Sequence, residues 1–145
     1  MLIKLLPDQI TRFWETIEFC LKETFPTYRE KEINNLLESM LSQKMLCWLV
    51  VEQKEEKRYP EGVILTCFGN DLNGSKNMII YMLYIFAESD KVPFDIWVEG
   101  FETLVKFAKS EKCNSIVAFS NIDSIVEKAK MLSNVITQTF MCFQL

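Results

Sequence analysis

The sequence predicts a mixed α/β fold, a single domain with a mostly antiparallel sheet and helices on both faces. Two amphipathic helical segments come first, three strand-like runs follow at hairpin spacing, and a strand–helix–strand unit spans Asn77–Phe119. Hairpin-linked strands pair antiparallel, whereas a crossover helix implies one parallel pair. The 145 residues suit one domain, which we place at residues 1–145.

The first part of the chain predicts a strand and two helices. Met1–Leu6 alternates weakly, which indicates a short strand. Pro7 suits a first helical turn, and apolar residues recur at helical spacing from there through about Lys22. Thr27 is followed three residues later by Glu30, a capping box that opens the second helix.

The middle of the chain predicts three strands joined by two turns. Cys47–Val51 and Gly62–Phe68 are rich in apolar and β-branched residues, and Asn77–Phe86 is apolar on both faces, as in a central strand. The charged segment Lys54–Pro60 indicates a solvated turn. Gly69–Gly74 carries the glycine, asparagine and aspartate typical of a tight turn.

The last part predicts a third helix beginning at Pro93, a buried strand at Ser115–Phe119 and a fourth helix at Ile122–Leu132. Asn134–Leu145 alternates and predicts a closing strand. The predicted order is therefore β-α-α-β-β-β-α-β-α-β.

This order, with Glu61–Thr66 (EGVILT) and Asn121 after the strand Ser115–Phe119, resembles the GNAT acetyltransferase family over essentially the whole chain. Met45–Val50 (MLCWLV), Met78–Ser89 and Ile96–Asn121 look like the short GNAT-like proteins encoded by tailed bacteriophages. The resemblance implies acyl transfer from acetyl-CoA or another acyl-CoA to an amine.

If acyl-CoA is bound, the resemblance implies four cofactor-binding residues. Phe86 and Ala87 would offer backbone groups to the pantetheine arm, Lys91 would meet a phosphate, and Asn121 would contact the thiol end.

The segment expected to hold the pyrophosphate, Ala87–Phe94, departs from the family pattern because it contains no glycine. Glycines let backbone N–H groups approach a phosphate closely. Pro93 removes one donor, and the carboxylates of Glu88, Asp90 and Asp95 oppose the single ammonium of Lys91. An acidic turn that complements its own helix dipole explains these residues without a ligand.

The catalytic groups that the resemblance implies are also missing. The chain has no histidine, and its fourth helix has no tyrosine to protonate the departing thiolate. The matching position is Lys128 or Ala129, and we interpret Lys128 as a solvated helix lysine.

We therefore expect no catalytic residues and no cofactor, in a GNAT-like domain that is non-catalytic and binds an unidentified protein or belongs to a phage virion. The alternative is an atypical acyl-CoA-dependent N-acyltransferase. A homodimer through the C-terminal strand is a third expectation, because an exposed edge of that composition invites pairing.

Other constellations favour structural interpretations. Asp95, Glu99 and Glu102 fit the solvated face of the third helix rather than a metal site. Tyr81 and Tyr84, three residues apart on a strand, should point to opposite faces of the sheet. One of them is then expected to line the crevice where that strand separates from Ser115–Phe119.

The composition of the chain argues against disulfide-stabilised, nucleic-acid-binding and membrane-spanning classes of protein. The five cysteines show no CxxC spacing, which indicates buried thiols in a reducing cytoplasm, of the host if the protein is phage-encoded. The net charge is −4 and the basic residues are interleaved with acids, so we expect no nucleic-acid binding. Apolar runs fall short of the roughly 20 residues that a membrane span needs.

Overall fold

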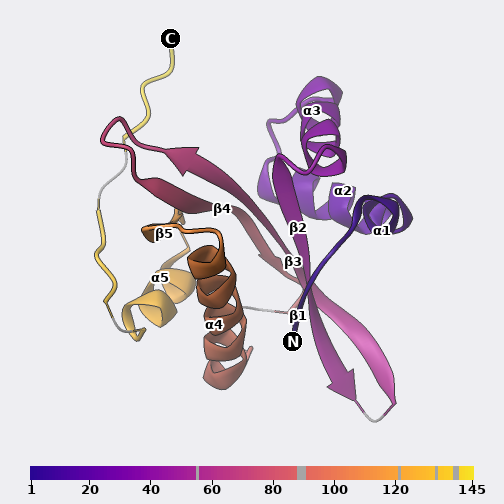
Figure 1. The fold of residues 1–145 in the computed structure, drawn as a ribbon. Coiled ribbons are helices and arrows are strands. Elements are labelled where there is room, and N and C mark those ends of the chain that lie inside the picture. The colour runs from indigo at the N-terminus through magenta and orange to yellow at the C-terminus, as the bar shows by residue number, and fades with distance from the viewer. Residues whose placement is uncertain (55, 88–90, 121, 133, 139–140) are drawn as a thin grey trace.

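The computed structural model describes residues 1–54, 56–87, 91–120, 122–132, 134–138 and 141–145. They build one five-stranded sheet in which spatial order follows chain order (Figure 1). Its strands are β1 (Leu2–Lys4), β2 (Met45–Lys54), β3 (Lys57–Asn70), β4 (Lys76–Ile85) and β5 (Ser115–Ala118). The first four pair antiparallel and β4 pairs with β5 in parallel, which confirms the predicted mixed, mostly antiparallel sheet.

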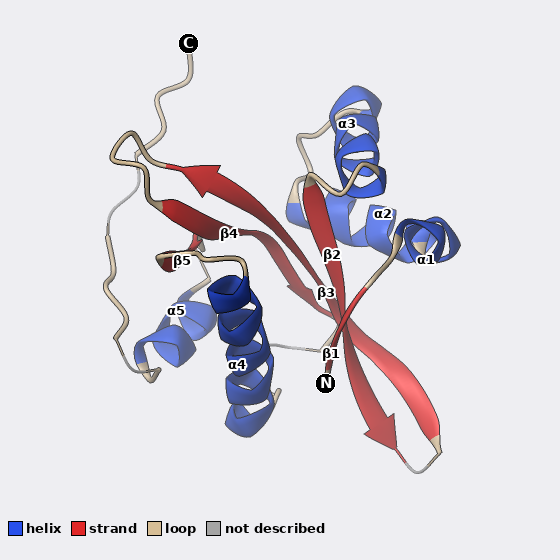
Figure 2. Ribbon diagram, viewed as in Figure 1, coloured by secondary structure: helices blue, strands red, loops and turns tan. Residues whose placement is uncertain are grey.

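Helices cover both faces of the sheet, also as predicted (Figure 2). On one face lie α1 (Pro7–Arg12), α2 (Trp14–Thr24) and α3 (Glu30–Leu41), and on the other lie α4 (Phe94–Ser110) and α5 (Asp123–Lys130). In the described part of the chain, no helix is long and apolar enough to cross a membrane.

The sheet separates two hydrophobic cores because successive strand residues face opposite ways. Cys47 and Leu65 belong to the core under α1–α3, together with Ile17 of α2. Their chain neighbours Trp48 and Ile64 belong to the core under α4.

The first two helical predictions need correction in detail. The segment predicted as one helix from Pro7 to Lys22 is two helices, because the backbone turns at Phe13, where φ is −97° and ψ is 10°. The second helix begins at Glu30, and the cap is formed by the amide of Arg29, which donates to Oε2 of Glu32 at 2.9 Å. Thr27 therefore does not cap it.

The charged segment Lys54–Pro60 is mostly strand rather than turn. The ladder between β2 and β3 runs on to the pair Lys54 and Lys57, past a register shift between Val50 and Val51. Arg58, Tyr59 and Pro60 of β3 are exposed, so this part of the strand has both faces in water and is as polar as a turn would be.

The predicted closing strand Asn134–Leu145 is wrong for the residues that the structure describes there, 134–138 and 141–145. They form no strand, and Ile136 and Phe143 are 84% and 81% exposed. Alternation suits a strand, but a strand also needs a neighbour to pair with. The described chain therefore ends its regular structure at α5, without the last strand of the predicted order.

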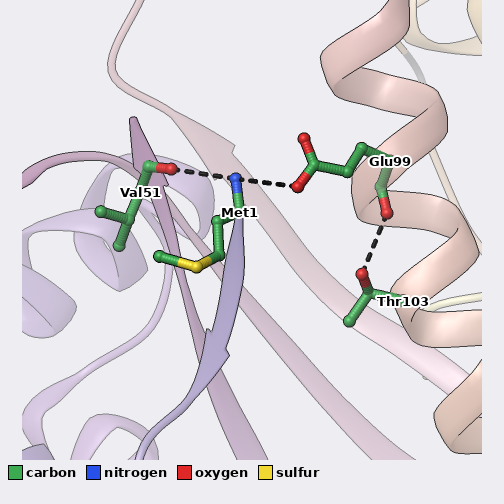
Figure 3. A network of polar contacts seen from close by, with 4 residues as sticks. All are labelled: Met1, Val51, Glu99 and Thr103. Carbon is green, nitrogen blue, oxygen red and sulfur yellow. Dashed lines mark hydrogen bonds and ion pairs between the residues drawn. The ribbon is translucent and has the colours of Figure 1, made fainter. Parts of the chain in front are cut away.

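The amino group of Met1 ties the first strand to α4 (Figure 3). It donates to the carbonyl oxygen of Val51 at 3.0 Å and lies 3.5 Å from Oε1 of Glu99. The hydroxyl of Thr103 donates to the carbonyl oxygen of Glu99 one turn further along. Glu99 thus faces water, as predicted, but also holds the N-terminal end of α4 against the sheet.

Candidate functional site

A β-bulge interrupts β4 halfway along its length. Leu65 pairs with Met82 and Thr66 pairs with Ile80, so Tyr81 is an extra residue outside the register. Tyr81, Met82 and Tyr84 consequently all lie on the face covered by α1–α3, while Ile80 and Leu83 lie on the α4 face. The prediction that Tyr81 and Tyr84 point to opposite faces is wrong, because the bulge shifts the alternation by one residue.

Beyond the bulge, β4 has an open edge on the side of β5. The parallel pairing runs only from Asn77 with Ser115 to Ile80 with Ala118, whereas β4 continues to Ile85. Among the described residues, no strand continues the sheet beside residues 81–85. Unpaired backbone groups at such an edge can pair with an extended ligand.

Backbone geometry decides which groups face this open edge. The amide of Phe86 donates to the carbonyl oxygen of Glu61 at 2.9 Å, on the β3 side. Neighbouring residues of an antiparallel pair direct their amides and carbonyls to opposite sides, so those of Ile85, and of Leu83 two residues earlier, face the open edge. The amide of Phe86, predicted to be offered to a cofactor, is already bonded within the sheet.

The helix after β4 begins at Phe94, and its N-cap residue is Pro93. The side chain of Pro93 makes no capping hydrogen bond. Nζ of Lys128 donates to the carbonyl oxygen of Val92 at 3.2 Å and lies 5.2 Å from the centre of the Trp97 ring. Lys128 is therefore not the solvated lysine that we predicted, since it joins α5 to the start of α4.

The four residues predicted to contact acyl-CoA are only partly described. Phe86 and Ala87 are exposed at the end of β4, and Lys91 is exposed three residues before α4. Asn121 lies outside the described residues, as do Glu88 and Asp90 of the glycine-free loop.

Two groups of aromatic side chains cover the bulged half of β4 on the α1–α3 face. In the first, the hydroxyls of Tyr28 and Tyr81 are hydrogen-bonded at 2.7 Å, and Phe25 stacks on Tyr28 with ring centroids 4.6 Å apart. Burial raises the pKa of the Tyr81 hydroxyl, and the hydrogen bond to Tyr28 raises it further. Tyr81 therefore stays neutral, and its hydrogen bond to Tyr28 braces β4 against the segment between α2 and α3.

The second group, here called the aromatic patch, consists of Phe19, Tyr84 and Phe86. The Tyr84 ring meets the other two at steep angles, with centroids 6.1 Å from Phe19 and 5.8 Å from Phe86. Phe19 is 52% exposed and Phe86 is 40% exposed. Glu23 follows Phe19 by four residues on α2, so the two side chains project from the same side of the helix. Burial raises the pKa of Tyr84, and the negative charge of Glu23 raises it further.

The sequence held a signal for this patch. Ile17, Cys20 and Leu21 form the buried stripe of α2, and Phe19 lies off that stripe. A single exposed aromatic residue is ordinary on a protein surface, and it is the contact with Tyr84 that makes Phe19 part of a patch.

A hollow of about 340 Å³ lies between α2 and α3, near Tyr28. Two carboxylates (Glu18 and Glu30) and two cations (Lys22 and Arg29) line it, and Glu18 is paired with Lys22 at 3.1 Å. Because the two negative and two positive charges around this hollow balance, it favours neither an anion nor a cation. The open edge of β4 is therefore the better candidate site.

Solved structures of acetyltransferases share this fold. An aminoglycoside acetyltransferase, meta-AAC0020, from an uncultured soil metagenomic sample and in complex with sisomicin, superposes with a TM-score of 0.73 at 11% identity, covering 100% of this chain and 94% of its own. The chain has the GNAT fold. AAC(6')-Iy gives a TM-score of 0.72 at 9% identity, with 100% and 97% covered, and a Trypanosoma brucei acetyltransferase gives 0.65 at 12%, with 100% and 99% covered.

No protein-family model matches the sequence, and no curated protein matches it. The expected bacteriophage origin thus stays a prediction.

One comparison corrects the expectation that the chain holds no cofactor. The structure of AAC(6')-Iy is a complex with a bisubstrate analogue, CoA-S-monomethyl-acetylneamine. A neighbour of the same fold therefore holds a CoA moiety, and this finding overturns the expectation of no cofactor. The absence of glycine from Ala87–Phe94 is not sufficient evidence that no cofactor binds.

Proposed function

We propose that this protein is an acyl-CoA-dependent N-acyltransferase. The observation that carries the proposal is the open edge of β4 at residues 81–85, where the pairing with β5 has ended. This feature supports the atypical N-acyltransferase, which was the alternative in the sequence analysis. It gives less support to the non-catalytic domain that the sequence favoured.

The exposed groups fit an acyl-CoA in two places. The pantetheine arm is an extended chain with two amides, and Leu83 and Ile85 present the strand-edge groups that such a chain can bond. The first turn of α4, whose N-cap Pro93 provides no capping side chain, would offer backbone N–H groups and a positive potential to the pyrophosphate. Lys91 adds one cation, while Asp95 in the first turn weakens the attraction.

The reaction would take place where β4 leaves β5. The amine nitrogen of the acceptor attacks the thioester carbonyl, the C–S bond breaks, and the proton lost by the amine is balanced by protonation of the departing CoA thiolate, which gives the thiol. The chain's part is to hold the two substrates in contact, which contributes much of the rate in bimolecular transfers.

Calorimetry with acetyl-CoA and longer acyl-CoAs, followed by a thiol-release assay over a panel of amines, tests the proposal. We expect Lys91→Glu to weaken acyl-CoA binding by about tenfold, the size expected for losing a charged hydrogen bond. Lys106→Glu is the matched control, because it makes the same charge change on an exposed face of α4.

Failure of every acyl-CoA to bind would contradict the proposal. The non-catalytic protein-binding domain, whether phage-encoded or not, would then be the better description. Binding without release of thiol over the whole amine panel would contradict the transferase activity alone.

A further inference from the structure

The aromatic patch lies on the same half of β4 as the open edge. Tyr84 falls within residues 81–85, and Phe86 follows directly, while Phe19 approaches from α2. The patch faces the side of the sheet opposite α4, whose first turn would hold the phosphates. If acyl-CoA comes from the α4 side, an acceptor reaching the thioester from the other side crosses these rings.

Two properties of the patch specify what it can bind. The rings of Phe19 and Phe86 are half-exposed and meet Tyr84 nearly edge to face, an arrangement that a further ring extends favourably. Glu23 lies one helical turn after Phe19 on the same side of α2 and brings a negative charge there, and aromatic faces also attract cations. A planar apolar group joined to a cation satisfies both.

We propose that the acyl acceptor is a primary amine attached to an aromatic ring, with the ring lying on Phe19, Tyr84 and Phe86 and the ammonium group directed toward Glu23. This inference rests on the proposed function, because the bound amine is an acyl acceptor only if the protein transfers acyl groups. The binding site itself is testable without acyl-CoA.

Calorimetric titration of the protein with 2-phenylethylamine hydrochloride at neutral pH is the first test. We expect ethylamine, which lacks the ring, and 2-phenylethanol, which lacks the charge, each to bind about tenfold more weakly or worse. If either analogue binds as well as 2-phenylethylamine, or if 2-phenylethylamine does not bind at about 10 mM, the proposal is wrong.

Variants then locate the site. Phe19→Ala removes a half-exposed ring and Glu23→Gln removes the charge while keeping the shape, and each should weaken 2-phenylethylamine by about fivefold. Leu72→Ala is the control, since Leu72 is fully exposed in the turn between β3 and β4. Melting curves check that the variants are folded, and wild-type affinity in both Phe19→Ala and Glu23→Gln would overturn the assignment.

The two proposals fail in different ways. Thiol release that is equally efficient with ethylamine and 2-phenylethylamine would refute the aromatic acceptor and leave the transferase standing. Binding of 2-phenylethylamine that depends on Phe19 and Glu23, with no thiol release from any acyl-CoA, would refute the transferase and support the amine site.

Discussion

A buried polar bond lies inside the core between the sheet and α4. The indole N–H of Trp48 donates to the hydroxyl of Thr66 at 2.9 Å, with both side chains buried. The Thr66 hydroxyl accepts from an indole N–H that cannot reach water, so removal of the hydroxyl leaves a buried donor without a partner.

We expect Thr66→Val to lower the free energy of unfolding by about 1–3 kcal/mol, because it leaves the indole N–H without an acceptor. Urea denaturation measures the change. Thr103→Val is the control, since Thr103 makes only an exposed bond within α4 and its replacement should cost about 0.5 kcal/mol or less. Equal effects of the two substitutions would show that the buried bond contributes nothing.

The buried thiols predict how stability depends on alkaline pH. Burial raises the pKa of Cys47 to about 12, and the charge of neighbouring Cys20 acts in the same direction. A group whose pKa is raised on folding stabilises the native state below its unfolded pKa, and that stabilisation is lost as pH rises toward the folded pKa. We expect the free energy of unfolding to fall between about pH 9 and pH 12 for this reason.

Urea denaturation across that range checks the prediction. Cys47→Ala lowers stability at neutral pH by leaving a cavity, but it should reduce the alkaline decline. An identical decline in wild type and Cys47→Ala would assign it to other groups.

The pairing of β3 with β4 depends on one glycine. A Cβ atom on Gly62 would lie 2.4 Å from the carbonyl oxygen of Tyr84 and 2.9 Å from Cδ1 of Ile85. The two strands approach closely opposite Ile85, at the end of the open edge of β4.

We expect Gly62→Ala to destabilise the protein by about 1–3 kcal/mol and to weaken ligand binding at the edge of β4, because the strand must move away. Gly100→Ala is the matched control: nothing lies within 4 Å of its added methyl group, and in the middle of α4 it should stabilise by about 0.5–1 kcal/mol. Thermal melting and the acyl-CoA titration report the two effects, and wild-type behaviour of Gly62→Ala would show that the strands can separate freely.

At the scale of elements, hydrophobic periodicity predicted most helices and strands and their order. It could not predict the bulge at Tyr81, since a bulge arises from the register between β4 and β3 rather than from the composition of either strand. That one residue decides the face of Tyr84, and with it the aromatic patch. The open edge of β4 could not be predicted from the sequence either, because it depends on how short β5 is.

At the scale of the whole molecule, the segment after α5 stands out. Residues 134–145 contain no Asp, Glu, Lys or Arg, and Ile136, Met141 and Phe143 are exposed. The sheet has no strand beyond β5 in the described part of the chain, so this edge and the apolar segment are both available to a second copy.

We predict self-association at high protein concentration, measured by sedimentation velocity at two concentrations. Replacing both Ile136 and Phe143 with Lys should shift the distribution toward monomer, because charges on an edge oppose strand pairing. Leu72→Lys, a charge added at an exposed turn, should leave it unchanged. A wild-type protein that is monomeric at both concentrations would exclude the dimer.

The contact between Lys128 and Trp97 gives the molecule an optical reporter of its own site. In the described part of the chain the indole N–H of Trp97 has no hydrogen-bond partner. Lys128, which lies over the Trp97 ring, also donates a hydrogen bond to the carbonyl oxygen of Val92, just before α4. A ligand that moves this helix start would change the surroundings of the indole and shift its emission. Fluorescence from an unlabelled sample, compared with Trp97→Phe, could then follow occupancy in real time.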